Sequence, residues 1–230
     1  MNNVALILAE IVSAALSFIL VRFMIKPYQY TRESRYIGLP LGFAFLGISY
    51  LFMGFALSSD NINFVEDMKW LQLFTQAYAF AFLATTYYFS KQTLEQKTRL
   101  SSHFIFSALI VGLIISCLIV FVPPLFALPS YKAVDEYFKV FNIIFASYIA
   151  LWTLRSHALK PEPKTIWAPL GYFLLAFGQY CSLIWSLDSS FSAFVSAHNF
   201  RLAGLLVFLF VSYKAFVAPH NVQQEVKGLK

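Results

Sequence analysis

Six polar or charged side chains lie within long apolar stretches or near their edges, and these are the residues that could bind a ligand. Each is a functional candidate, because an unpartnered amide or ionisable group in apolar surroundings is costly. Counted at about 1.5 Å per residue from the same end of the predicted helices, they lie towards that end. We expect them to line a cavity that binds a small molecule. The six candidates are Glu10, Tyr50, Gln76, Asn142, Gln179 and Arg201.

The same groups have simpler interpretations. Interhelical amide hydrogen bonds, worth about 0.6–2 kcal/mol each, would make Asn142 and Gln179 packing residues, and for either one taken singly this is the favoured interpretation. Glu10 and Arg201 lie near the same end of the first and last predicted helices. We therefore expect an ion pair between them rather than a proton relay. A neutral, protonated Glu10 is the third alternative.

A lysine near the end of the last apolar stretch raises the question of a cofactor. The sequence Val-Ser-Tyr-Lys at 211–214 resembles the retinal-binding segment of microbial rhodopsins, which implies a retinal Schiff base on Lys214. Phe210 stands where those proteins carry an aspartate, and residues 70–90 contain no carboxylate to act as counter-ion. Because a buried cation without a counter-ion is strongly disfavoured, we expect Lys214 to reach towards the lipid headgroups instead.

No other pattern argues for catalysis, a metal or nucleic acid. The four histidines fall in predicted loops or interfaces, which leaves no helix-to-helix pair for haem and no ligand set for a metal. Cys117 and Cys181 lie deep in apolar runs and form no CxxC motif. The net charge of +6 fits cationic loops beside an anionic membrane surface better than it fits nucleic acid. We therefore expect a non-enzymatic protein without a metal.

The composition indicates a membrane protein. Of the 230 residues, 59% are apolar and 12% are charged, whereas soluble domains carry about 25% charged residues. A bilayer core needs about 20 mostly apolar residues per helix, and seven segments meet this need. They cover residues 4–25, 36–58, 70–90, 104–121, 137–154, 167–187 and 199–218. The predicted fold class is an all-α bundle of seven transmembrane helices.

The distribution of basic residues predicts the orientation. Thirteen of the 17 Lys and Arg residues lie on the side of the membrane where the first predicted helix ends. The four on the other side are Lys69, Lys132, Lys139 and Arg201. The positive-inside rule then predicts a multi-pass cell-membrane protein with its N-terminus outside and its C-terminus in the cytoplasm. We assign residues 1–219 to the transmembrane domain and 220–230 to a short cytoplasmic tail.

Two parts of the chain share an unusual motif. Pro-Leu-Gly-Phe at 40–43 and Pro-Leu-Gly-Tyr at 169–172 each follow a basic helix end and a proline, Pro27 and Pro161 respectively. This echo indicates two parallel three-helix repeats joined by a single helix, a 3+1+3 arrangement. The arrangement is similar to that of the SWEET sugar uniporters, which implies transport. Basic helix ends and prolines in a first turn also occur without duplication.

Two stretches carry a further resemblance. RYIGLPLGFAFLGISY at 35–50 and AFAFLATTYYFS at 79–90 look like an uncharacterised family of archaeal seven-helix membrane proteins, which implies an architecture and no activity. The leading hypothesis is a receptor-like protein or complex component that binds a small ligand or a membrane-protein partner from outside. The alternatives are a small-solute transporter and a retinal-type photoreceptor. A homo-oligomer is compatible with all three.

Overall fold

The computed structural model describes residues 3–90, 96–121, 131–159 and 166–216, and these ranges are helical. Two short helices, α2 (Lys26–Thr31) and the 3-10 helix η1 (Ser34–Ile37), connect the first two long ones. The long helices of the described ranges are α1 (Asn3–Met24), α3 (Gly38–Ser58), α4 (Ile62–Ser90), α5 (Gln96–Phe121), α6 (Tyr131–Leu159), α7 (Trp167–Asp188) and α8 (Phe191–Phe216). The all-helical prediction is confirmed, whereas the proposed tail at 220–230 lies outside the described residues.

Six of these long helices are long and apolar enough to cross a membrane, which supports a membrane protein. Among the described helices of sufficient length, α4 does not meet this criterion, because Gln, Thr and Tyr residues lower the hydropathy of its charge-free part at 70–90. It packs against α3, α5 and α6, so protein surrounds much of its surface. Its polar side chains therefore have protein neighbours, and the predicted segment 70–90 is only part of a 29-residue helix.

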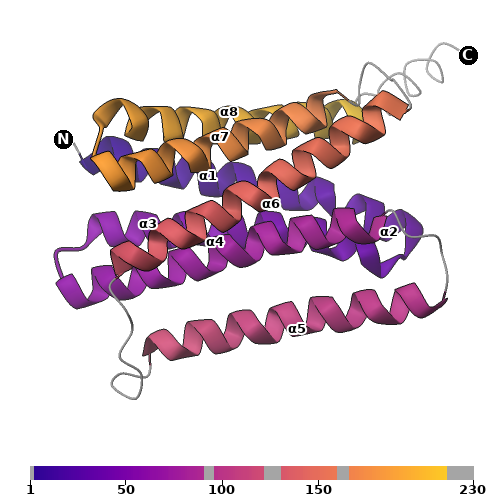
Figure 1. Cartoon of the computed structure of the whole chain (residues 1–230), viewed down its shortest axis with the longest axis horizontal. Coiled ribbons are helices and arrows are strands. Elements are labelled where there is room, and N and C mark those ends of the chain that lie inside the picture. Colours follow the sequence, from indigo (N-terminus) through magenta and orange to yellow (C-terminus); the bar gives the residue numbers. More distant parts are fainter. Residues whose placement is uncertain (1–2, 91–95, 122–130, 160–165, 217–230) are drawn as a thin grey trace, which may run out of the picture.

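Six helices form a closed ring. In ring order, α1 packs on α3, α3 on α4, α4 on α6, α6 on α7 and α7 on α8, and α8 returns to α1. Helix α5 stands outside the ring, against α4 and η1, as its isolated position in Figure 1 shows. The expected contact between the first and last long helices is thus present.

The ring encloses an apolar core in which small residues allow close helix approach. Phe43, Leu83 and Leu205 are fully buried there. A Cβ on Gly42 would lie 2.5 Å from Leu83 Cγ, so α3 and α4 can be this close only because residue 42 has no side chain. Gly171 of α7 does the same for α8, since its Cβ would lie 2.7 Å from the Phe208 ring.

The two ends of the bundle differ in how the chain turns. The α3–α4 link and the α7–α8 link lie at one end, together with the start of α1 (Figure 1). We call this the site end. Ser189 makes the second link short by adopting a left-handed conformation (φ 50°) and donating its N–H to the Trp185 carbonyl. Helix α8 ends at the opposite end of the bundle, so its last turn and the start of α1 are far apart.

Candidate functional site

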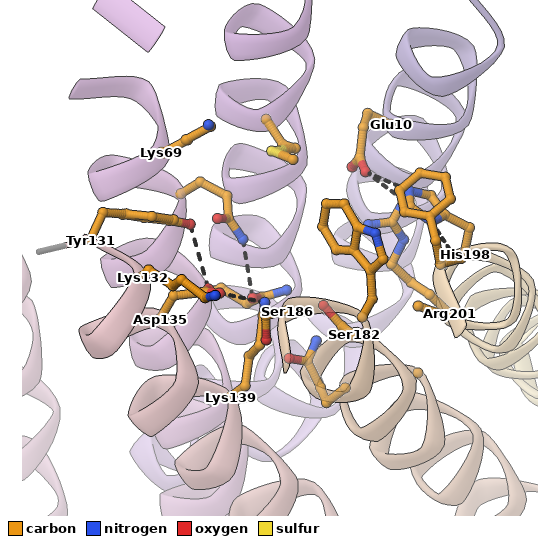
Figure 2. A pocket seen from close by; sticks show the side chains of 18 of the residues that line it. Glu10, Lys69, Tyr131, Lys132, Asp135, Lys139, Ser182, Ser186, His198 and Arg201 are labelled. Carbon is orange, nitrogen blue, oxygen red and sulfur yellow. Dashed lines mark hydrogen bonds and ion pairs between the residues drawn. The ribbon is translucent and has the colours of Figure 1, made fainter. Parts of the chain in front are cut away.

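A cavity of about 380 Å³ lies at the site end, and α1, α3, α4, α6, α7 and α8 all contribute to its lining. Its volume lies within the range of small-molecule sites, about 300–1,000 Å³. Exposed Lys132 and Ser189 are among the lining residues, so the cavity reaches the molecular surface at this end. Figure 2 shows two charged walls, one from α4 and α6 and the other from α1 and α8, with α7 between them.

The α1–α8 wall is built on a buried ion pair. Arg201 donates from Nη2 to Glu10 Oε1 at 2.9 Å, and the Nε2 atom of His198 lies 3.2 Å from the same oxygen. Glu10 is 2% exposed. The expected pairing of Glu10 with Arg201 is confirmed, and it joins the first and last helices where they are neighbours in the ring. Gly178 lets α7 lie close to α8 beside Arg201, because a Cβ there would lie 3.3 Å from the Arg201 backbone nitrogen.

Tyr50 supports this wall from behind. The Arg201 guanidinium lies 4.5 Å from the centre of the Tyr50 ring, a cation–π contact. Tyr50 is 1% exposed and does not line the cavity. Within the described residues, the Tyr50 hydroxyl, Glu10 Oε2 and Arg201 Nε are buried atoms without a hydrogen-bond partner. The structure therefore places Tyr50 as a positioning residue for Arg201.

The α6 part of the opposite wall holds a second ion pair. Lys139 pairs with Asp135 one turn before it, and the Tyr131 hydroxyl donates to the same carboxylate at 3.4 Å. Burial, together with the neighbouring Asp135, raises the pKa of Tyr131 above its ordinary value. The phenol therefore stays protonated and available as a donor at neutral pH.

Amides form the floor between the walls. Gln72 donates to Gln76 at 3.1 Å, and both line the cavity. Gln179 also lines it and accepts a long hydrogen bond, 3.4 Å, from Asn142. Asn142 itself is fully buried and does not reach the cavity. Asn142 thus joins α6 to α7, as its packing interpretation predicts, whereas Gln179 both packs and faces the cavity.

Three neighbouring rings from α7 and α8 form an aromatic column in the cavity lining. The Trp185 ring lies 4.9 Å from Phe194, and the Phe194 ring lies 4.4 Å from His198. On its other side, Trp185 lies 6.0 Å from Lys139 Nζ. These rings belong to the apolar part of the cavity lining, against which a ring or a short carbon chain could pack.

Four of the six predicted residues therefore line one cavity: Glu10, Gln76, Gln179 and Arg201. Sequence reasoning missed the lining residues Lys69, Asp135, Lys139 and His198. Lys69, Asp135 and His198 precede the predicted segments and Lys139 lies at the start of one, because the helices begin before the apolar runs do. The signal that would have found the α6 pair is the spacing of Tyr131, Asp135 and Lys139 at successive turns of one helix.

The other predicted groups lie elsewhere. Lys214 is exposed, is not among the cavity-lining residues, and has its Nζ 4.5 Å from the centre of the Phe210 ring. A retinal attachment there stays a prediction. Within the described ranges, no group of three His, Cys, Asp or Glu residues could hold a metal ion, and Cys117 and Cys181 are free thiols.

Comparisons with known protein families, with curated proteins and with solved structures give no match. The fold and the cavity are consistent with an integral membrane protein, and the expected resemblances to the archaeal family, the SWEET transporters and the microbial rhodopsins stay predictions.

Proposed function

We propose that this chain is a non-enzymatic, receptor-like membrane protein that binds a small ligand from the outer face in the cavity at the site end. One observation carries the proposal: six helices direct side chains into a single cavity of ligand size that reaches the surface. Isolated helix-joining amides would not require such a cavity. The charged walls also contain no Ser, Cys or Lys nucleophile activated by a neighbouring base within the described residues, which favours binding over catalysis.

The assignment of the site end to the outer face rests on charge. Lys69, Lys132, Lys139 and Arg201 are the only basic residues of the sequence allotted to this end, whereas Arg22, Lys26, Arg155 and Lys214 belong to helix ends at the other. The positive-inside rule places the more basic side in the cytoplasm. The cavity then faces outward, and the seven long helices cross the membrane with the N-terminus outside.

Thiol labelling tests this proposal. Ser182 lines the cavity, whereas Ser192 is exposed on the first turn of α8 and does not. With Cys117 and Cys181 replaced by Ala, we expect Ser182→Cys to react with a membrane-impermeant thiosulfonate added to intact cells. At least one solute among benzoate, glucose, glycine and choline should slow that reaction and leave Ser192→Cys unaffected. Labelling of Ser192→Cys with none at Ser182→Cys would contradict an outward cavity.

A second candidate, a small-solute transporter, is supported by correspondences between the halves of the ring. Every buried residue of α7 has a buried counterpart in α3 at the same spacing, starting with Pro169 and Pro40. Gly42 faces Leu83 of α4, and Gly171 faces Phe208 of α8. In this correspondence α1 is equivalent to α6, α3 to α7 and α4 to α8. The observed α1–α8 contact is then equivalent to the observed α6–α4 contact. These relations favour two parallel three-helix repeats.

The candidate site residues follow the same relations. Tyr50 and Gln179 lie two turns after Phe43 and Tyr172. Gln76 and Arg201 lie two turns before Leu83 and Phe208. Glu10 and Asn142 each begin an equally spaced set of buried residues, which continues with Ala14 and Ser17 in α1 and with Ala146 and Ile149 in α6. The six residues thus form three equivalent pairs, as expected for a site shared between repeats that move against each other.

Uptake into proteoliposomes separates the two candidates. A transporter should accumulate or equilibrate a solute that protects Ser182→Cys. If the three equivalent pairs of residues act in transport, Arg201→Gln should reduce uptake by at least about tenfold. A receptor should bind that solute in the same vesicles without moving it. If the wild-type protein in these vesicles binds the solute but takes none up, transport is excluded and the receptor-like function is retained.

A further inference from the structure

The charges around the cavity do not balance. Among the described residues, its lining contains the cations Lys69, Lys132, Lys139 and Arg201 and two carboxylates, Glu10 and Asp135. Each carboxylate already has its cation, since Glu10 pairs with Arg201 and Asp135 pairs with Lys139. Within the described part of the chain, Lys69 and Lys132 have no carboxylate within ion-pair distance. Two positive charges are therefore left over at one site.

These two lysines come from different helices and lie on the same side of the cavity (Figure 2). Lys69 of α4 has its Nζ 6.0 Å from the centre of the Tyr131 ring, and Lys132 directly follows Tyr131 in α6. Lys69 is partly buried, whereas Lys132 is exposed. Like charges in the lining of one cavity raise each other's energy, and a bound negative group lowers that cost.

The rest of the lining fits an organic molecule better than a bare inorganic ion. A cavity of about 380 Å³ is far larger than a monatomic or tetrahedral anion requires. Beyond the lysines, Trp185 offers a flat apolar surface, and Gln72, Gln76 and Ser186 offer uncharged hydrogen-bonding groups. This combination matches a charged head joined to an uncharged body of a few carbon atoms.

We infer that the ligand is a small organic anion of the carboxylate class, with its carboxylate between Lys69 and Lys132 and its body against Trp185. The inference rests on the proposed function, because it names the ligand class of the same cavity. The Glu10–Arg201 and Asp135–Lys139 pairs take no direct part in the charge recognition. Within each pair the two charges neutralise each other, and the pairs hold the walls in place. Lys69 and Lys132 therefore set the preference for an anion.

Thiosulfonates of opposite charge test the electrostatic part without a known ligand. In the cysteine-free background, Ser182→Cys should react at least about tenfold faster with an anionic sulfonate reagent than with a cationic trimethylammonium reagent, relative to the same ratio at Ser192→Cys. Lys69→Gln combined with Lys132→Gln should bring the ratio at Ser182→Cys down to that at Ser192→Cys. Arg155→Gln, an exposed site at the other end of α6, should leave the ratio unchanged.

Benzoate and its uncharged analogue benzamide test the ligand itself. Benzoate should slow the labelling of Ser182→Cys with a half-maximal concentration at least about tenfold below that of benzamide, and succinate should likewise be favoured over succinamide. The two lysine substitutions should remove this preference while leaving the thermal unfolding temperature in detergent unchanged. Inorganic phosphate should protect more weakly than benzoate, because it makes no contact with Trp185.

The outcomes separate this inference from the proposed function. Equal reaction rates for the two reagents, or protection by benzamide as strong as by benzoate, would overturn the anion inference while outward labelling keeps the binding function. Stronger protection by phosphate than by either carboxylate would replace the carboxylate class by an inorganic anion. No labelling of Ser182→Cys from outside would remove the proposed function itself.

Discussion

At the scale of single residues, the Glu10–Arg201 pair is the contact on which the site end depends most. It joins α1 to α8, and Tyr50 and His198 both pack against it. The gain from bringing two charges together in an apolar interior is largely offset by the loss of their hydration. Removing one partner is a different matter, because the remaining charge stays buried without compensation.

Arg201→Gln should therefore lower the free energy of unfolding by about 3 kcal/mol, since Glu10 would keep a charge while 2% exposed. The double variant with Glu10→Gln should be less destabilised than Arg201→Gln alone, because no unpaired charge remains. Chemical unfolding in detergent micelles measures both. Arg155→Gln, on the exposed surface, serves as the control and should change stability by at most about 0.5 kcal/mol. Equal stability of Arg201→Gln and the control would show that the pair contributes nothing.

The sequence was sufficient to predict this pair and not its surroundings. A lone carboxylate in an apolar run needs a partner, and Arg201 was a cation at similar depth on a neighbouring helix. Nothing in residue type or spacing indicates that the Tyr50 ring lies under the guanidinium, because that contact depends on the rotation of α3 about its own axis. The same holds for His198, whose ring reaches Glu10 only after α8 is packed.

At the scale of helices, hydrophobic patterning located each long helix and misjudged where several of them begin. Helix α4 begins at Ile62, α6 at Tyr131 and α8 at Phe191, each well before the apolar run that marks it. The early turns of α4 and α6 contain charged residues and those of α8 mix apolar residues with Ser and His, and they carry Lys69, Asp135 and His198 into the cavity. Apolar content measures contact with lipid, whereas a helix that lines a polar cavity can continue through charged residues.

Glycines set the distance between helices within each half of the ring. A Cβ on Gly42 would lie 2.5 Å from Leu83 Cγ and 3.1 Å from the Ala79 carbonyl oxygen, and one on Gly171 would lie 2.7 Å from Phe208. We expect Gly42→Ala and Gly171→Ala each to cost about 1–3 kcal/mol through overpacking. Thermal unfolding in detergent measures the change.

Gly54 provides the matched control on α3. Its added Cβ would meet its nearest neighbour, Glu10 Cβ, at 3.8 Å, which is an ordinary contact. Gly54→Ala should therefore be neutral or stabilise the helix by up to about 1 kcal/mol, because alanine restricts the unfolded chain and favours the helix. Similar destabilisation by all three substitutions would mean that helix spacing is not set by Gly42 and Gly171.

At the scale of the whole molecule, the proposed orientation follows from the charge difference between the two ends. Asp60 lies exposed in the α3–α4 link at the site end, and Thr31 lies exposed at the end of α2 at the other. In the cysteine-free background, an impermeant maleimide should label Asp60→Cys in intact cells and Thr31→Cys only after permeabilisation. Labelling of both from outside, or the reverse pattern, would place the cavity differently.

The closed ring was only partly predictable. The contact between the first and last long helices could be expected from their polar residues, and the Pro-Leu-Gly motif indicated a relation between α3 and α7. The 3+1+3 hypothesis singles out residues 104–121, which lie in α5, as the joining helix, but the apolar residues of this segment fit a buried and a lipid-facing helix equally well. Which helices contact each other is a property of three-dimensional packing that composition leaves open.

The position of α5, outside the ring and against α4 and η1, has a consequence for the origin of the chain. If two three-helix units lie in the same orientation, one polypeptide must cross the bilayer once more between them, and α5 makes that crossing. The cavity draws no side chain from it. A homodimeric ancestor with three helices per subunit would then have needed no equivalent of α5. By the same logic, co-expressed fragments divided between α5 and α6 should reassemble into a protein with the same cavity.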